Sequence, residues 1–176
     1  MVAIVAVAGT AGCGREAVAD PGPEIIQRSW PAAMAGGACA LLDYAAVESA
    51  IGTRFEASAA ATSAETGTCA LTVRDSTYPD LVLAITPSEV DKFSFATAMA
   101  PLGSATVPKL GQAAYRIVVP ARDDAGPQVE IGWLSANRRL MVLRYTFPPE
   151  AAPADANGLV GKMIELATAL DQRPTG

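Results

Sequence analysis

The chain has 176 residues, a formal net charge of −5 and no histidine. A chain of this length is expected to form one domain with short flanking segments, and it can bury a core without help from a metal ion. Its acidic balance argues against a nucleic-acid partner, because like charge repels the phosphate backbone. The missing histidine excludes Ser-His-Asp and Cys-His catalytic arrangements.

Residues 1–12 (MVAIVAVAGTAG) are uncharged and mostly apolar. As a helix they would span about 18 Å, which is too short for a hydrocarbon core of about 30 Å. The length suits the apolar region of a signal peptide instead. Two small residues, Ala11 and Gly12, precede Cys13. The run Thr10-Ala11-Gly12-Cys13 resembles the lipobox of bacterial lipoproteins, whose usual form is Leu-Ala-Gly/Ala-Cys; Thr10 replaces the common leucine.

This resemblance implies that residues 1–12 are removed as a signal peptide and that Cys13 is lipidated, with acyl chains such as palmitate. Two or three acyl chains hold a protein stably at a membrane. No basic residue precedes the apolar segment, which indicates that the start codon lies upstream or that the chain has been cut. The alternative is a buried N-terminal strand in which Cys13 occurs by chance.

Residues 13–38 are interpreted as the lipidated cysteine and a flexible tether. Gly- and Pro-bearing sequence is typical of such spacers, and residues 31–38 have linker composition. Residues 25–30 (IIQRSW) are more apolar and are expected to dock on the domain or to touch the membrane interface. A single exported domain is predicted over residues 39–172.

Once Cys13 is set aside, Cys39 and Cys69 remain. An exported compartment is oxidising, so an even pair there indicates a disulfide. Closing a ring of about 31 residues would stabilise the fold by roughly 3–4 kcal/mol. Two alternatives stay open: a redox or metal pair, although Cys-x-x-Cys spacing is missing, and two free buried thiols.

The first part of the domain is expected to form a helix, a short strand and then a hairpin. A helix is predicted over residues 41–52, with Asp43 as its N-cap and Gly52 after its end. Residues 53–57 are expected to form a short strand and residues 58–67 a loop. Alternation and turn residues then predict strands over 68–75 and 81–86.

The middle helix is expected to start at Pro87–Asp91 and to end before Pro101. Ser88 and Asp91 have the spacing of a capping box. Its inward face is predicted to carry Val90, Phe93, Thr97 and Met99.

Three strands and a final helix are predicted after the loop 104–112. The strands are expected at 113–120, 128–136 and 139–147, and the amphipathic helix at 157–170, with Leu159, Met163, Leu166 and Leu170 inward. Hairpins dominate this order, so the predicted fold class is α+β. We expect a mainly antiparallel sheet on which a short N-terminal helix, a middle helix and a C-terminal helix pack.

No motif indicates catalysis, and we expect no enzyme activity, no cofactor and no metal. A Ser-x-x-Lys nucleophile and a Gly-rich phosphate loop are missing from the sequence. Asp123-Asp124 is interpreted as a solvated turn, with calcium binding as the alternative. Trp133 and Tyr145 are expected in the core, with an aromatic binding pocket as the alternative.

Arg138, Arg139 and Arg144 lie around one predicted hairpin and form a basic spot in the sequence. A solvated turn is the simpler interpretation of Arg138 and Arg139, and the rim of a partner-binding surface is the alternative.

Several short motifs carry a second resemblance. They are Cys39-Ala-Leu-Leu-Asp43, Ile51-Gly52, Cys69-Ala-Leu-Thr72 and Leu110-Gly-Gln-Ala-Ala-Tyr115. Together they resemble a family of uncharacterised actinobacterial lipoproteins, from mycobacteria and streptomycetes, over roughly residues 38–170. The resemblance implies an exported domain and a disulfide between Cys39 and Cys69, and it implies no activity.

The sequence therefore predicts a cell-envelope lipoprotein on the outer face of the cell membrane, anchored through Cys13. We expect a monomeric, non-catalytic binding module for a lipid, a small ligand or an envelope protein. The alternative is a structural or accessory protein of an envelope complex. The binding module requires a groove between the sheet and a helix.

Overall fold

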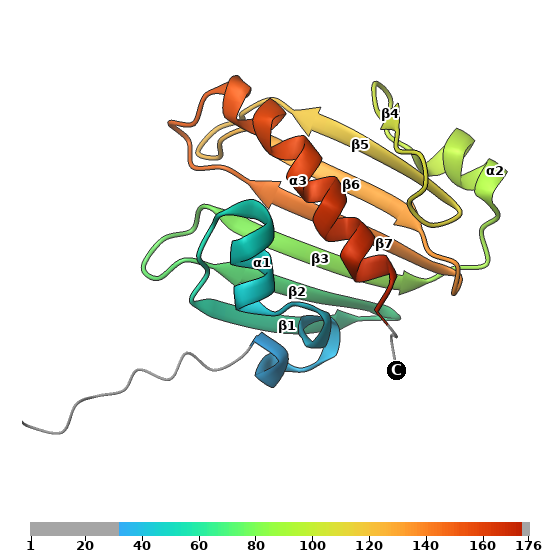
Figure 1. The fold of residues 1–176 in the computed structure, drawn as a ribbon, viewed down its shortest axis with the longest axis horizontal. Helices are drawn as coiled ribbons and strands as arrows, with labels where there is room; N and C mark the ends of the chain where they lie inside the picture. The colour runs from blue at the N-terminus through green and yellow to red at the C-terminus, as the bar shows by residue number, and fades with distance from the viewer. Residues whose placement is uncertain (1–31, 174–176) are drawn as a thin grey trace, which may run out of the picture.

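In the computed structural model, residues 32–173 are described, and they form an α+β fold (Figure 1). The helices are two short 3-10 helices, η1 (Ala32–Ala35) and η2 (Gly37–Leu41), then α1 (Tyr44–Ile51), α2 (Lys92–Ser94), the π-helical turn η3 (Phe95–Met99) and α3 (Pro153–Asp171). The strands are β1 (Ala57–Ser63), β2 (Thr66–Thr72), β3 (Asp80–Pro87), β4 (Ala105–Thr106), β5 (Ala113–Val119), β6 (Gln128–Leu134) and β7 (Arg139–Thr146). The predicted fold class is thus confirmed.

The strands form one antiparallel sheet in the order β1-β2-β3-β7-β6-β5-β4. At its centre β3 pairs with β7 from Asp80–Thr146 to Pro87–Arg139. β5, β6 and β7 follow one another as neighbours, as their order in the chain and the short connections between them predict. The segment between β3 and β5 carries the chain from the middle of the sheet to its far edge.

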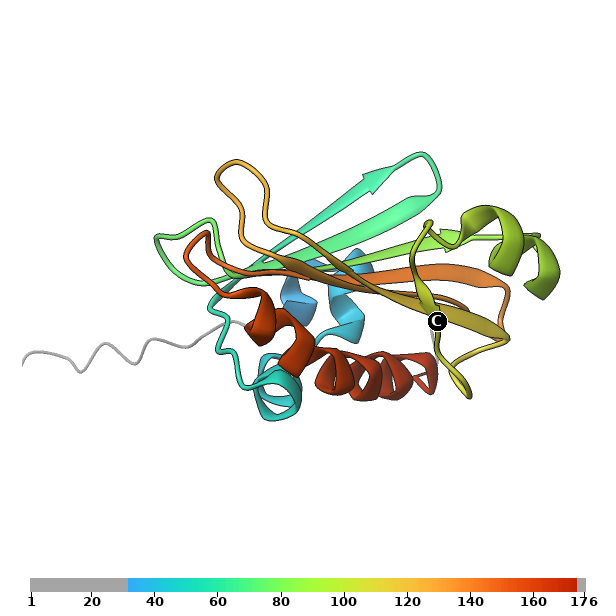
Figure 2. The same ribbon diagram turned by 90° about the horizontal axis from the view of Figure 1, so that it is seen from above.

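Helices α1 and α3 cover one face of the sheet, and α2 with η3 lies at one end of the opposite face (Figures 1 and 2). We call these the helix-covered face and the open face. Leu83, Leu143 and Ile131 lie side by side in the strand register and are buried. The predicted apolar side of α3, Leu159 to Leu170, is likewise buried. The main core therefore fills the space between the sheet and these helices.

Local signals at both ends of α1 act as the sequence predicts. The backbone N–H of Ala46 donates to Asp43 Oδ1 at 2.9 Å, which satisfies one of the N–H groups that a helix start leaves unpaired. Gly52 ends the helix in the left-handed conformation, with φ 81°. Val47 and Ile51 turn into the core between these ends.

A disulfide joins Cys39 on η2 to Cys69 on β2, as predicted. The two Cα atoms are 4.9 Å apart, and both residues are fully buried. The bond therefore fixes η2 against the sheet. Disulfides persist in oxidising compartments, so this one favours an extracytoplasmic location.

The prediction of a strand at 53–57 and a loop at 58–67 is wrong. Residues 57–63 form β1, which pairs with β2 from Ala57–Thr72 to Ser63–Thr66. The segment is built from Ala, Ser and Thr and is largely exposed, so it lacks the apolar alternation that indicates a strand. Backbone pairing with β2 makes it a strand nonetheless, and Ala64, with φ 51°, turns the hairpin.

Residues 32–38, assigned to the tether from their composition, are partly helical and packed. Ala32 and Ala38 are buried, and these residues lie in or beside η1 and η2. Their small side chains allow close approach to the sheet: a Cβ on Gly37 would lie 3.8 Å from the Cβ of Ala60. The folded domain thus includes residues before Cys39.

The middle helix is shorter than predicted, and a different side of it faces the core. Asp91 caps it, because its Oδ1 accepts bonds from the N–H groups of Phe93 and Ser94, both at 2.8 Å. The chain then widens into a π-turn, closed by the bond from Ala100 N to Phe95 O at 3.1 Å. Phe95 is buried, whereas Phe93 and Met99, which were predicted to face inward, are exposed. The 3.6-residue period assumed for this segment does not hold through the π-turn.

The C-terminal helix α3 begins at Pro153, before the predicted start at residue 157. Proline fits the first turn because it has no N–H to leave unpaired, and Asp155 Oδ2 accepts a bond from Ala152 N at 2.9 Å. Between residues 32 and 173, no helix is long and apolar enough to cross a membrane.

Replacing both Cys39 and Cys69 by alanine is expected to lower the free energy of unfolding by about 3–4 kcal/mol, because the unfolded chain regains the freedom that the ring removes. Urea unfolding followed by circular dichroism measures the change, and Cys13→Ala, which leaves the bond intact, is the control. Equal urea midpoints for reduced and oxidised wild-type protein would contradict this role of the disulfide.

Candidate functional site

A cavity of about 530 Å³ lies on the helix-covered face, at the end of the sheet where β3 ends and β7 begins. One wall is η2, and the other is formed by residues that β1, β2, β3 and β7 direct toward it. Its lining residues are Gly37, Ala38, Ala40, Leu41, Thr62, Glu65, Gly67, Ile85, Pro87 and Arg139. The binding-module interpretation requires such a space between the sheet and a helix.

Small residues create this cavity. Gly67 has no side chain, and a Cβ placed there would meet the Cβ of Ala38 at 3.9 Å, an ordinary van der Waals contact. The disulfide lies next to both walls of the cavity. Cys39 follows the lining residue Ala38 on η2, and Cys69 lies on β2, the strand that carries the lining residue Gly67. The covalent bond therefore holds the two walls at a fixed separation, and the small side chains leave space between them.

The lining is mostly apolar, with two charged residues. Arg139 is half-buried at the start of β7, and Glu65 is exposed in the turn between β1 and β2. A guanidinium beside apolar walls can bind a carboxylate or a phosphate through two parallel hydrogen bonds. The cavity is thus suited to a molecule with an apolar body and an anionic head.

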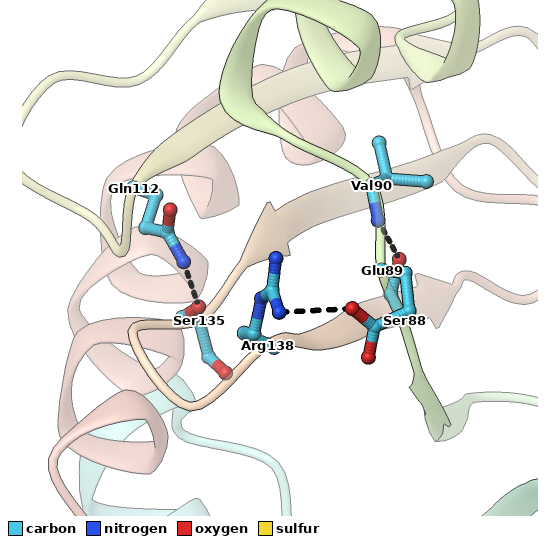
Figure 3. A network of polar contacts seen from close by, with 6 residues as sticks. All are labelled: Ser88, Glu89, Val90, Gln112, Ser135 and Arg138. Carbon is cyan, nitrogen blue, oxygen red and sulfur yellow. Dashed lines mark hydrogen bonds and ion pairs between the residues drawn. The ribbon is translucent and has the colours of Figure 1, made fainter.

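The structure separates the three arginines that the sequence groups together. Arg138 turns away from the sheet, and its Nη1 lies 2.8 Å from Glu89 Oε2 in an exposed ion pair (Figure 3). Arg139 lines the cavity, and Arg144 lies on the open face, where its Nε is buried without a hydrogen-bond partner in the described part of the chain. A solvated turn is the right interpretation for Arg138, and it is wrong for Arg139.

A network of polar contacts fixes the turn that precedes Arg139 (Figure 3). Gln112 Nε2 donates to Ser135 O at 2.9 Å, and the backbone N–H of Ser88 donates to Arg138 O at 2.9 Å. The hydroxyl of Ser135, a nearly buried residue, accepts a bond from Arg139 N at 3.2 Å. These bonds tie the β6–β7 turn to two other loops and so set the position from which Arg139 enters the cavity.

Tyr115 and Glu130 form a further polar pair, on the open face. Tyr115 Oη donates to Glu130 Oε1 at 2.8 Å, and its ring lies over Gly132, where a Cβ would overlap it. Burial, followed by the neighbouring Glu130 carboxylate, raises the pKa of the Tyr115 hydroxyl. The hydroxyl therefore stays protonated at neutral pH and acts as a hydrogen-bond donor.

Other residues singled out in the sequence have structural positions. Trp133 is fully buried, and its Nε1 donates a hydrogen bond to Asp171 Oδ1 at 3.0 Å. Tyr145 is buried beside Phe55 and Phe147. Both are core residues, as expected. Asp123 has φ 48° and lies in a tight turn. Among residues 32–173, no group of three or more His, Cys, Asp or Glu side chains is placed to hold a metal ion.

Sequence reasoning missed most of the cavity. Cys13 lies outside the described residues. Of the residues singled out in the sequence, Arg139 lines the cavity, and the disulfide pair lies beside the lining residues Ala38 and Gly67. Gly37, Ala38 and Gly67 give no chemical signal in a sequence, because they contribute space rather than functional groups. Comparison of the chain with protein families, curated proteins and solved structures finds no match.

The Tyr115–Glu130 pair predicts a loss of stability at alkaline pH. Because the pKa of Tyr115 is raised in the fold, its contribution is complete below the unfolded value of about 10 and falls as the pH rises above it. The difference in unfolding free energy between wild type and Tyr115→Phe should thus be constant from pH 7 to 9 and shrink above pH 10, by up to about 1.4 kcal/mol per pH unit.

Urea unfolding at several pH values measures this difference, with Tyr78→Phe in the β2–β3 loop as the control. A difference that does not change between pH 7 and pH 11 would show that the raised pKa of Tyr115 has no part in stability.

Proposed function

We propose that this chain is a lipid-anchored binding protein of the bacterial cell envelope that holds a small amphiphilic ligand in the cavity between η2 and the sheet. The observation that carries the proposal is a cavity of about 530 Å³ with apolar walls and the Arg139 side chain in its lining. Cavities of roughly 300–1,000 Å³ with few polar groups are typical of small-molecule sites.

The chemistry of the lining favours binding over catalysis. Its only ionisable side chains are those of Glu65 and Arg139. The neighbouring cysteines are joined to each other, and no hydrogen bond links the hydroxyl of Thr62 to Glu65 in the described residues, so the lining shows no activated nucleophile. A ligand with an acyl chain or another apolar body and one anionic group fits these walls.

The location belongs to the same proposal. The lipobox-like run ending in Cys13 supports export and anchoring on the outer face of the membrane, and the disulfide agrees with an oxidising compartment. The motifs shared with uncharacterised actinobacterial lipoproteins support the same location. An anchored domain meets amphiphilic molecules where they are most concentrated, which is at the membrane surface.

Variants of the cavity test ligand binding, with dansyl-undecanoic acid as the probe. Gly67→Leu should fill the cavity and weaken binding at least tenfold. Arg139→Met keeps the apolar stem but removes the cation, so we expect a loss of roughly 10–100-fold, the equivalent of one charge-assisted bond. Fluorescence titration gives the dissociation constants.

Arg138→Met is the matched control, because Arg138 is adjacent to Arg139 in the sequence but pairs with Glu89 and does not line the cavity. It should bind the probe as wild type does. The proposal fails if the probe does not bind wild type, or if Gly67→Leu and Arg139→Met bind it unchanged while remaining folded.

The anchor is tested by intact mass spectrometry of protein extracted from its native membrane. The expected mass is that of residues 13–176 plus acyl groups and less two hydrogens for the disulfide. Cys13→Ser should not be acylated and should leave the membrane fraction. An unmodified chain that begins at Met1 would contradict the lipoprotein proposal.

A further inference from the structure

The segment that follows β3 exposes large apolar side chains to solvent at three positions between residues 93 and 102. Phe93 is 74% exposed, Met99 is 39% exposed and Leu102 is fully exposed. The only other large hydrophobic residue with such exposure in residues 32–173 is Met34 on η1. Scattered single exposures are normal on a protein surface, whereas Phe93, Met99 and Leu102 belong to one short segment, which makes this segment a candidate for an interaction site.

The segment is held in this orientation by its own contacts. Phe95 is buried and stacks on Tyr115, with ring centroids 5.8 Å apart. Asp91 caps the helix start, and Thr97 Oγ1 donates to Phe93 O at 2.9 Å. Phe95 occupies the buried side of the segment, so Phe93 and Met99 lie on its exposed side.

The shape of the segment favours a lipid surface as the partner. It projects from one end of the sheet (Figure 2), and a fully exposed Leu102 cannot line a groove. A projecting apolar side chain can enter a fluid interface that closes around it, whereas a protein partner needs a complementary hollow. The local charges do not oppose this contact: Lys92 adjoins Phe93, the Asp91 carboxylate is held by the cap bonds, and Glu89 is paired with Arg138.

The tether gives this segment access to the membrane. An extended chain over residues 13–31 reaches at most about 65 Å, and a flexible one averages roughly 24 Å. Both lengths allow a domain anchored at Cys13 to lie against the bilayer. One acyl signal is commonly reinforced by a second contact from the protein.

We propose that the α2–η3 segment, through Phe93, Met99 and Leu102, inserts into the lipid interface and orients the domain on the membrane. This inference rests on the proposed lipid anchor. It deepens the proposed function, because α2 follows β3 (Figure 1) and the cavity borders the end of β3, so the two lie at the same end of the sheet, on opposite faces. A domain that touches the bilayer at this end holds its cavity close to the membrane surface.

The direct test is a nitroxide label at Leu102→Cys in the lipidated chain, reconstituted at low protein density in vesicles of phosphatidylcholine and phosphatidylglycerol. The label should be more accessible to oxygen than to a water-soluble nickel complex, and the ratio should rise at least about fivefold on reconstitution. A label at Met34→Cys, on the matched exposed residue of η1, should remain in water. A label at position 102 that stays in water overturns the proposal.

A second arm does not depend on the anchor. The full chain with Cys13→Ser is sedimented with the same vesicles, alone and with Phe93→Ser, Met99→Ser and Leu102→Ser together. Removing the three apolar side chains should lower the bound fraction at least about fivefold, whereas Met34→Ser should not. Equal binding overturns the membrane contact even if Cys13 is lipidated.

The two proposals fail separately. The intact mass of the reconstituted sample reports whether Cys13 carries lipid, so a missing anchor contradicts the proposed function, whereas sedimentation of the Cys13→Ser chain tests the membrane contact of the α2–η3 segment by itself. If the label at position 102 leaves water only at high protein density, the segment contacts another protein or a second copy, and the lipid proposal is wrong.

Discussion

The bond between Cys39 and Cys69 is the constraint on which the site depends. It joins a short 3-10 helix, which has little stability of its own, to the second strand of the sheet. The end of η2 is also held by the buried Leu41 side chain and by a hydrogen bond from Arg173 Nη1 to Leu41 O at 2.6 Å. At the cavity itself the facing residues are Gly37, Ala38 and Gly67, which bury little apolar area, so the covalent link adds most to the fixed separation of the walls there.

A helix or strand could be predicted where its sequence carries both a pattern of apolar residues and residues that mark its ends. α1 has Asp43 and Gly52 at its ends, and β5, β6 and β7 are short runs rich in β-branched and other apolar residues between clear turns. β1 could not be predicted in this way, because an edge strand of Ala, Ser and Thr has no buried side to mark it. Its position is decided by backbone pairing with β2, which depends on the whole sheet.

The site was harder to predict than the fold for a related reason. Phe93 and Phe95 are two positions apart, and only the π-turn with its stacking on Tyr115 decides which of them is buried. Arg138 and Arg139 are adjacent, yet the turn sends one toward Glu89 and the other into the cavity. Each of these choices is settled by tertiary contacts with loops distant in the sequence. The sequence alone identified the cysteine pair because a covalent bond needs only two matching residues.

The edge of the sheet at β1 has a consequence for how the chain behaves when its cysteines are reduced. β1 contains neither a charged residue nor a proline, which are the usual protections against the addition of a foreign strand. The element that lies beside it is η1, which leads into η2 (Figure 1). Oxidation of the two cysteines thus also holds a cover in place at an aggregation-prone edge. A reduced chain would lose the bond that holds this cover, so we expect the disulfide also to lower the tendency of β1 to pair with a strand of another chain.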